Sequence, residues 1–221
     1  MTLLSKIILG ALIAFTLYTF WPRESTKVAN IDHLKIEQTI NSEVSIMGIT
    51  IGSSTLQAAE KMLQERPETA MFIPAKSNKD QSIQLEAYME EHQLVLGLEA
   101  DLDLIEKIKR NGKNPFVFPS GVIKVGIGDK ESDAVNALLI NSLTLISHNR
   151  VNLEQFEQRY GKPGQIIQTT DGYVHFLYPD LGLDLTRGPE GADALQFVDP
   201  KHFARLLSPL KAMQPSPQPS P

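Results

Sequence analysis

A long uncharged run near the start of the chain is the sequence feature that most constrains its fold. The 15 residues from Ile7 to Trp21 carry no charge, and counting from Thr2 gives 20 residues if the Lys6 side chain extends to the interface. A helix of that length spans about 30 Å, which is the thickness of the hydrocarbon layer of a bilayer. Pro22 then ends the helix. The sequence therefore predicts a transmembrane anchor over residues 1–21.

A cleaved secretory signal peptide is the first alternative for this run, and a soluble segment is the second. A signal peptide needs small residues just before its cleavage site, whereas bulky and then charged residues follow this run. We therefore favour an uncleaved signal anchor that contacts the lipid bilayer through residues 2–21. Basic residues flank the run on both sides, so the orientation rests on its likeness to a secretory signal. That likeness places the short tail inside and the bulk of the chain outside.

Composition excludes several classes of function. The 221 residues carry a net charge of −5, so no basic surplus exists to neutralise phosphates, and we expect no nucleic-acid partner. The chain has no cysteine, which excludes disulfides, thiolate zinc sites, thiol catalysis and a lipidated cysteine. We expect no cofactor and no metal, because no histidine pair has the spacing of a ligand motif.

The rest of the chain divides into four segments by composition. Residues 22–45 are polar and are interpreted as a stalk or linker. Two modules follow, over residues 46–124 and residues 125–207. Residues 208–221 end in a proline-rich sequence that can neither pair in a sheet nor continue a helix, so we expect a disordered tail there.

The two modules follow a similar plan, in which helices with one apolar face precede alternating strands. In the first module the patterns predict a helix after Ser54, a hairpin from Ile83 to Leu98, a helix from Leu102 to Lys109 and a second hairpin from Phe116 to Ile127.

The second module repeats the plan with a helix after Gly128 and another that begins after Asn152. Three short strands follow, over Tyr173–Tyr178, Leu181–Thr186 and Ala194–Asp199. The predicted fold class is therefore α+β: an N-terminal transmembrane helix followed by two small helix-plus-antiparallel-sheet modules, which are candidates for an internal repeat.

This plan resembles the SmpA/OmlA (BamE-like) domain, which belongs to a small lipoprotein of the β-barrel assembly machinery. The related fold of secreted β-lactamase inhibitory proteins is also similar. The resemblance covers residues 126–203, and Gly161-Lys162-Pro163 with the strand Tyr173–Tyr178 carries most of it. It implies a non-catalytic protein-binding module in a bacterial envelope, and with the anchor an inner-membrane protein whose bulk is periplasmic. The family's lipidated cysteine has no counterpart in this chain.

Three groups of residues are candidates for chemistry, and each has a structural explanation. Glu99, Asp101 and Asp103 alternate and could serve a hydrolase, but carboxylates also suit the N-terminus of a helix. Gly126-Ile-Gly128-Asp129 is similar to a phosphate-binding loop, although Glu131 stands where its third glycine would be. His175 is interpreted as a structural imidazole, and Ser53 and Ser54 as helix-capping residues.

Protein binding is the function that the sequence favours. Tyr173, Phe176 and Tyr178 are the candidate contact residues, and the edge of the three-strand meander can accept an added strand from a partner. We expect a scaffold or modulator of envelope assembly that binds an envelope or membrane protein. An extracytoplasmic inhibitor or sensor that binds an enzyme or peptide is the first alternative, and a membrane-tethered hydrolase that uses the acidic residues is the second.

Overall fold

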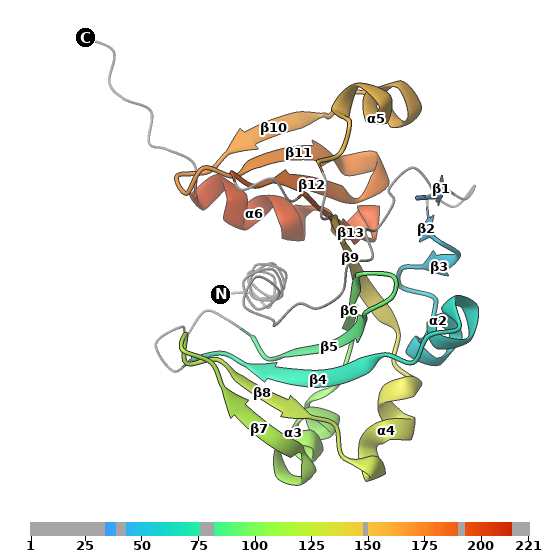
Figure 1. The fold of residues 1–221 in the computed structure, drawn as a ribbon, viewed down its shortest axis with the longest axis vertical. Helices are drawn as coiled ribbons and strands as arrows, with labels where there is room; N and C mark the ends of the chain where they lie inside the picture. The colour runs from blue at the N-terminus through green and yellow to red at the C-terminus, as the bar shows by residue number, and fades with distance from the viewer. Residues whose placement is uncertain (1–33, 39–42, 76–81, 148–149, 190–192, 214–221) are drawn as a thin grey trace.

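The computed structural model describes residues 34–38, 43–75, 82–147, 150–189 and 193–213. These residues form mostly antiparallel β-sheet, with few helices (Figure 1). One sheet has ten strands and the other has three. The strand order in the large sheet is β10-β11-β12-β13-β9-β6-β5-β4-β8-β7. The prediction of an α+β chain with two small modules is therefore wrong, because the strands of both predicted modules belong to one continuous sheet.

Two meanders converge on the central strand of this sheet. The first runs inward from β4 to β6 and the second runs inward from β10 to β13, and both innermost strands pair with β9. The hairpin of β7 and β8 extends the first meander beyond β4. The strands are β4 (Glu68–Ile73), β5 (Gln84–Met89), β6 (Leu94–Leu98), β7 (Lys113–Val117), β8 (Ile123–Gly126), β9 (Ile140–Ser147), β10 (Gln165–Gln168), β11 (Val174–Tyr178), β12 (Leu183–Arg187) and β13 (Asp193–Val198).

The central position of β9 follows from burial on both of its faces. Leu143 and Leu145 point into the main core, while Thr144 and Ile146 are buried on the opposite face. A strand of this kind has no polar face, so it is stable only between two other strands with packing above and below. The alternating pattern that identifies a half-buried strand is therefore missing, and the sequence did not predict β9.

The helices are short and lie on the faces of the sheet. Their ends match local signals: the Asp101 carboxylate caps α3 by accepting from the Leu104 N–H at 2.8 Å, and the Asn152 side chain caps α5 by accepting from the Gln155 N–H at 3.2 Å. The helices are α2 (Leu56–Leu63), α3 (Leu102–Asn111), α4 (Asp129–Asn136), α5 (Leu153–Tyr160) and α6 (Ala204–Ala212), with 3-10 turns η3 (Pro179–Leu181) and η4 (Pro200–His202). The small sheet consists of β1 (Ile36–Gln38), β2 (Val44–Ile46) and β3 (Ile49–Thr50).

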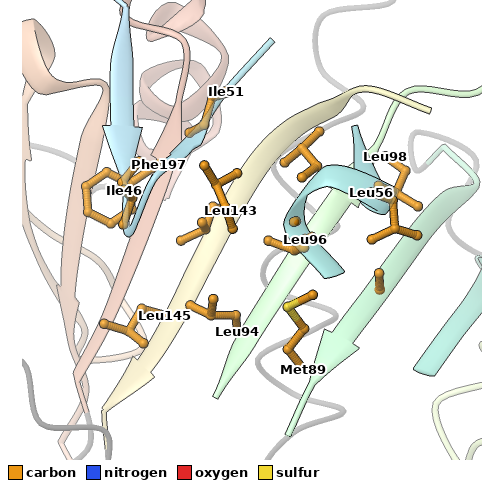
Figure 2. Close-up of a cluster of buried hydrophobic side chains, with 14 of the residues drawn as sticks. Ile46, Ile51, Leu56, Met89, Leu94, Leu96, Leu98, Leu143, Leu145 and Phe197 are labelled. Atoms are coloured by element: carbon orange, nitrogen blue, oxygen red, sulfur yellow. The ribbon is translucent and has the colours of Figure 1, made fainter. Parts of the chain in front are cut away.

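The main core lies on one face of the large sheet, between the sheet and the helices and small sheet that cover it. Figure 2 shows part of it, in which residues from β5, β6, β9 and β13 meet residues from α2 and the small sheet. On the opposite face, α6 covers the second meander. The side chains of Leu206 and Leu210 pack there against Ile167, Leu177 and Val198.

Among the residues that the structure describes, every helix is too short or too polar to cross a bilayer. This finding contradicts the predictions of a transmembrane protein, of a bacterial inner-membrane location and of a periplasmic bulk. The segment 2–21 on which those predictions rested lies outside the described residues, as do His33, His148 and the tail from residue 214 onward.

Candidate functional site

The two outermost strands of the large sheet, β7 and β10, differ in whether their unpaired backbone N–H and C=O groups are protected from pairing with another chain. The edge strand of a sheet presents N–H and C=O groups to which another chain can pair, and proteins protect such edges with proline, bulges and charge. In β7, Pro115 has no N–H, Asn114 has a left-handed φ of 47°, and the pairing register shifts between Lys113 and Phe116. The Lys113 amine also lies 2.6 Å from an Asp129 carboxylate oxygen. The β7 edge is therefore protected.

The β10 edge has none of these protections. Its sequence, Gln-Ile-Ile-Gln, contains neither proline nor charge, and its residues have ordinary extended backbone. Ile166 is 56% exposed, and Gln165 and Gln168 are exposed as well. Ile167 is fully buried. The strand is thus anchored on one face by a single apolar side chain and open along its outer edge.

Hydrogen bonding shows which backbone groups of β10 face outward. The Thr169 N–H donates to the Tyr173 carbonyl at 2.9 Å, and the register aligns Ile167 with His175 two residues further along. Because hydrogen-bonded pairs recur every second residue in an antiparallel ladder, Ile167 bonds inward to β11. The N–H and C=O groups of Ile166 and Gln168 therefore point away from the sheet.

One turn and two contacts hold β10 in place. Gly161 ends α5 with a φ of 85°, a conformation that favours glycine, and the chain then turns through Pro163 into the strand. The Ile167 side chain inserts into the cluster beneath α6. At the far end, the Thr170 N–H donates to the carbonyl of Met213, just after α6, at 3.1 Å. The exposed edge is therefore held by the rest of the fold.

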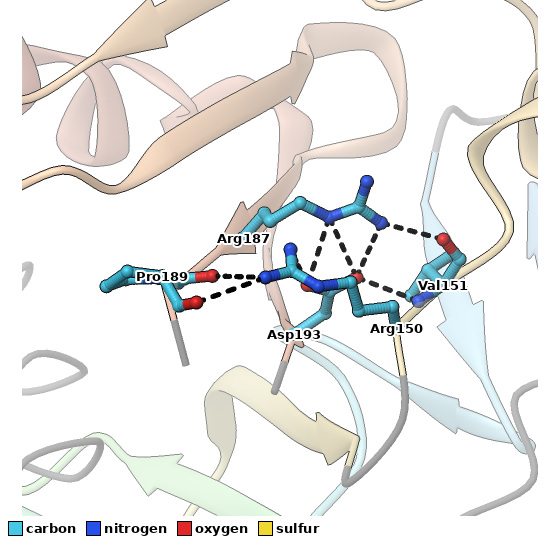
Figure 3. Close-up of polar contacts among 6 residues, drawn as sticks. Arg150, Val151, Arg187, Pro189 and Asp193 are labelled. Atoms are coloured by element: carbon cyan, nitrogen blue, oxygen red, sulfur yellow. Dashed lines mark hydrogen bonds and ion pairs between the residues drawn. The ribbon is translucent and has the colours of Figure 1, made fainter. Parts of the chain in front are cut away.

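An ion pair between Arg187 and the buried Asp193 joins β12 to β13 (Figure 3). Asp193 is fully buried, and one of its carboxylate oxygens accepts from an Arg187 nitrogen at 2.8 Å and from the Val151 N–H at 2.8 Å. Arg187 also donates to the Val151 carbonyl at 2.7 Å, and Arg150 donates to the Gly188 carbonyl at 3.0 Å. This network joins the segment before α5 to β12 and β13.

The three predicted aromatic contact residues do not form one exposed surface. Tyr178 is only 4% exposed, its ring lies 5.4 Å from that of Phe156, and burial beside Glu157 raises its pKa to about 12. Phe176 is half-buried on the same face, with the Arg187 guanidinium 5.8 Å from its ring centre. Tyr173 is also half-buried and precedes β11. Phe176 is the cross-strand partner of Ile166, and the Tyr173 carbonyl accepts from the Thr169 N–H just beyond β10.

The acidic residues of the hydrolase hypothesis are all exposed. Asp101 caps α3, and Asp103 lies 2.6 Å from the Lys107 amine, which lowers the pKa of the Asp103 carboxyl. A general acid requires the opposite shift, and Glu99 lies exposed beyond the end of β6. These side chains do not converge in a buried site that could support acid–base chemistry.

His175 is buried and paired, as a structural imidazole would be. Its Nδ1 lies 2.8 Å from Asp184 Oδ2 and 3.1 Å from Thr186 Oγ1, on the α6 side of the sheet. Within the described part of the chain, no three histidine or acidic side chains are grouped so that they could hold a metal ion.

The glycine and serine motifs have structural roles. A Cβ atom at Gly128 would lie 2.8 Å from both the Asn111 carbonyl and a Glu131 carboxylate oxygen, so the absence of a side chain at Gly128 is explained by close packing. The Ser54 hydroxyl accepts from the Thr50 N–H at 2.9 Å, and Thr55, rather than Ser54, caps α2. Ser53 is exposed in the turn before it.

Comparison of the chain with family models, with curated proteins and with solved structures found no match. The resemblance to the SmpA/OmlA domain stays a prediction, and the β10 edge is the candidate site that the structure itself supplies. Sequence reasoning predicted that an edge of the second meander could accept a strand, but β10 was not among the predicted strands. Its signal was a short apolar pair between two glutamines after Gly164.

Proposed function

We propose that this chain is a non-catalytic protein-binding module that accepts an extended segment of a partner protein along β10. The unprotected edge, with the outward backbone groups of Ile166 and Gln168, is the observation that supports this function. Strand addition uses main-chain hydrogen bonds for affinity and alternate side chains for specificity. Each such bond contributes about 0.5–1.5 kcal/mol, so a short added strand suits a regulated interaction.

The contrast with β7 supports this reading. A chain under pressure only to avoid aggregation would protect both ends of its sheet, as β7 is protected by Pro115 and its bulge. Leaving β10 open while holding it between α6 and β11 fits an edge that is used. Both a scaffold for another protein and an inhibitor that binds an enzyme would employ such an edge. They differ in whether the partner's activity falls on binding.

Matched proline substitutions test this proposal. Ile166→Pro removes an outward N–H without breaking a bond to β11, because proline is tolerated on a sheet edge. Val117→Pro is the control: the Phe118 N–H donates inward to Val122 at 2.9 Å, so the Val117 N–H points outward too, and Val117 is 62% exposed. A photo-crosslinking amino acid is placed at position 165 in each variant, and its adducts are identified in cells that make the protein.

We expect a reproducible adduct that Ile166→Pro abolishes and Val117→Pro leaves intact. Adducts that persist in the Ile166→Pro protein would show that the partner does not pair with β10. The partner isolated in this way is then assayed for loss of activity, which separates the scaffold from the inhibitor.

A further inference from the structure

We infer that a second copy of this chain can occupy the β10 edge, forming a dimer in which two β10 strands pair antiparallel around a two-fold axis. This inference rests on the proposed function, because it names a partner for the same edge. Its support comes from backbone geometry, from the absence of charge along the strand and from the protection of β7.

The outward backbone groups fit a symmetric pairing. Ile166 and Gln168 are two residues apart, which is the repeat of hydrogen-bonded pairs in an antiparallel ladder. If Ile166 of one copy lies opposite Gln168 of the other, two-fold symmetry also places Gln168 of the first copy opposite Ile166 of the second. The outward N–H and C=O groups of both residues are then hydrogen-bonded in each copy. Ile167 of each copy then lies at the two-fold axis, and the α6 faces of the two copies lie on the same side of the extended sheet.

Charge does not oppose the pairing. The strand itself is uncharged, so no like charges face each other when two copies pair along it. The nearest charged residues in the chain, Lys162 and Asp171, lie outside the strand, and Asp171 lies in the turn toward β11, where its carboxylate accepts a hydrogen bond from the Thr169 hydroxyl.

The protected β7 edge limits the assembly to two copies. Pairing of identical edges closes on itself around a two-fold axis, whereas pairing between two different edges would continue without end. Pro115, the bulge at Asn114 and the ion-paired Lys113 prevent β7 from serving as a second pairing edge. The same pairing covers Ile166, which is 56% exposed in the single chain.

Sedimentation of the full chain over a range of concentrations is the first measurement. We expect a monomer–dimer equilibrium that Ile166→Pro shifts to monomer and Val117→Pro leaves unchanged. Circular dichroism establishes that both variants are folded.

Disulfide formation tests the register, because the chain has no cysteine of its own. Directly opposed residues on paired strands lie close enough for a disulfide, whereas diagonal neighbours do not. A mixture of the Ile166→Cys and Gln168→Cys proteins should therefore crosslink on mild oxidation, while each protein alone should not.

A chain that stays monomeric up to its solubility limit would overturn the inference, and so would a dimer that Ile166→Pro does not affect. The two proposals remain distinguishable. If the chain is monomeric but Ile166→Pro still abolishes an adduct with a different protein, the proposed function stands and the self-pairing fails. If the chain is monomeric and Ile166→Pro removes no adduct, both fail.

Discussion

The two halves of the large sheet, on either side of β9, differ in the pairing of their carboxyl groups and in the protection of their outermost strands. The half from β10 to β13 pairs its buried carboxylates, Asp193 with Arg187 and Asp184 with His175, and leaves its outer edge open. The half from β4 to β8 protects its edge but contains the half-buried Glu86, whose carboxyl has its pKa raised by desolvation. The half from β10 to β13 is therefore open to a partner at its edge, and among the described residues its buried Asp184 Oδ1 and Tyr178 hydroxyl have no hydrogen-bond partner. The half from β4 to β8 is closed at its edge and carries the half-buried Glu86 carboxyl.

The largest effect should come from removing the buried carboxylate of the second half. Asp193→Ala leaves the Arg187 guanidinium and the Val151 N–H without their acceptor, so the free energy of unfolding should fall by about 3–5 kcal/mol. Urea unfolding measures this change. The matched control is Asp129→Ala, since Asp129 forms an exposed ion pair with Lys113 and should change stability little. Equal losses in the two variants would contradict this account of Asp193.

Substitution in β9 tests whether the two halves unfold together. Leu143 is fully buried in the strand that both meanders share, so Leu143→Ala should lower the free energy of unfolding by about 2–5 kcal/mol. Amide hydrogen exchange should show earlier loss of protection in β5 and in β12 alike. Loss confined to one of these strands would mean that the halves are separate cooperative units, as the two-module prediction would have required.

Glu86, in the half from β4 to β8, predicts that the free energy of unfolding depends on pH. Burial raises the pKa of its carboxyl from 4.5 to about 8, and its cross-strand neighbours, Ala70 and Gly97, supply no cation. The folded chain therefore holds this proton more tightly than the unfolded chain. The resulting stability is fully present below pH 4.5 and is lost as the pH rises to about 8.

The slope should be at most about 1.4 kcal/mol per pH unit across that window. Denaturant titrations at several pH values measure it, and Glu86→Gln should flatten the profile. Glu99→Gln, which alters an exposed carboxyl, serves as the control and should leave the slope unchanged. A profile that is the same in the Glu86→Gln protein and the native chain would place the titration elsewhere.

Opening the protected edge should have the smallest effect on stability and a clear effect on association. Pro115→Thr restores an N–H at an exposed position of β7, so the free energy of unfolding should change by no more than about 0.5 kcal/mol. Because a second edge then becomes able to pair, we expect species larger than a dimer in sedimentation experiments. Unchanged sedimentation would show that the bulge at Asn114 and the Lys113 ion pair are sufficient to protect β7.

Sequence reasoning was most accurate where structure depends on neighbouring residues. The predicted hairpin of β5 and β6, the helix after Asp101 and the helix after Asn152 are present, because alternation, capping groups and the terminating Gly112 and Gly161 act over a few residues. Both outer strands of the predicted three-strand meander, β11 and β13, are paired in the structure. The true edge strand, β10, was missed because four residues without strict alternation carry little signal.

The chain alone determined its turns, its helix ends and the absence of charge along Gln165–Gln168. Tertiary structure decided that β9 joins two meanders, that Tyr178 is buried and that Asp193 meets Arg187. It also decided which end of the sheet stays open. These features depend on contacts between residues far apart in the sequence, and the strength of those contacts comes from burial and from the exclusion of water. No local pattern encodes which distant strand will provide the contacts.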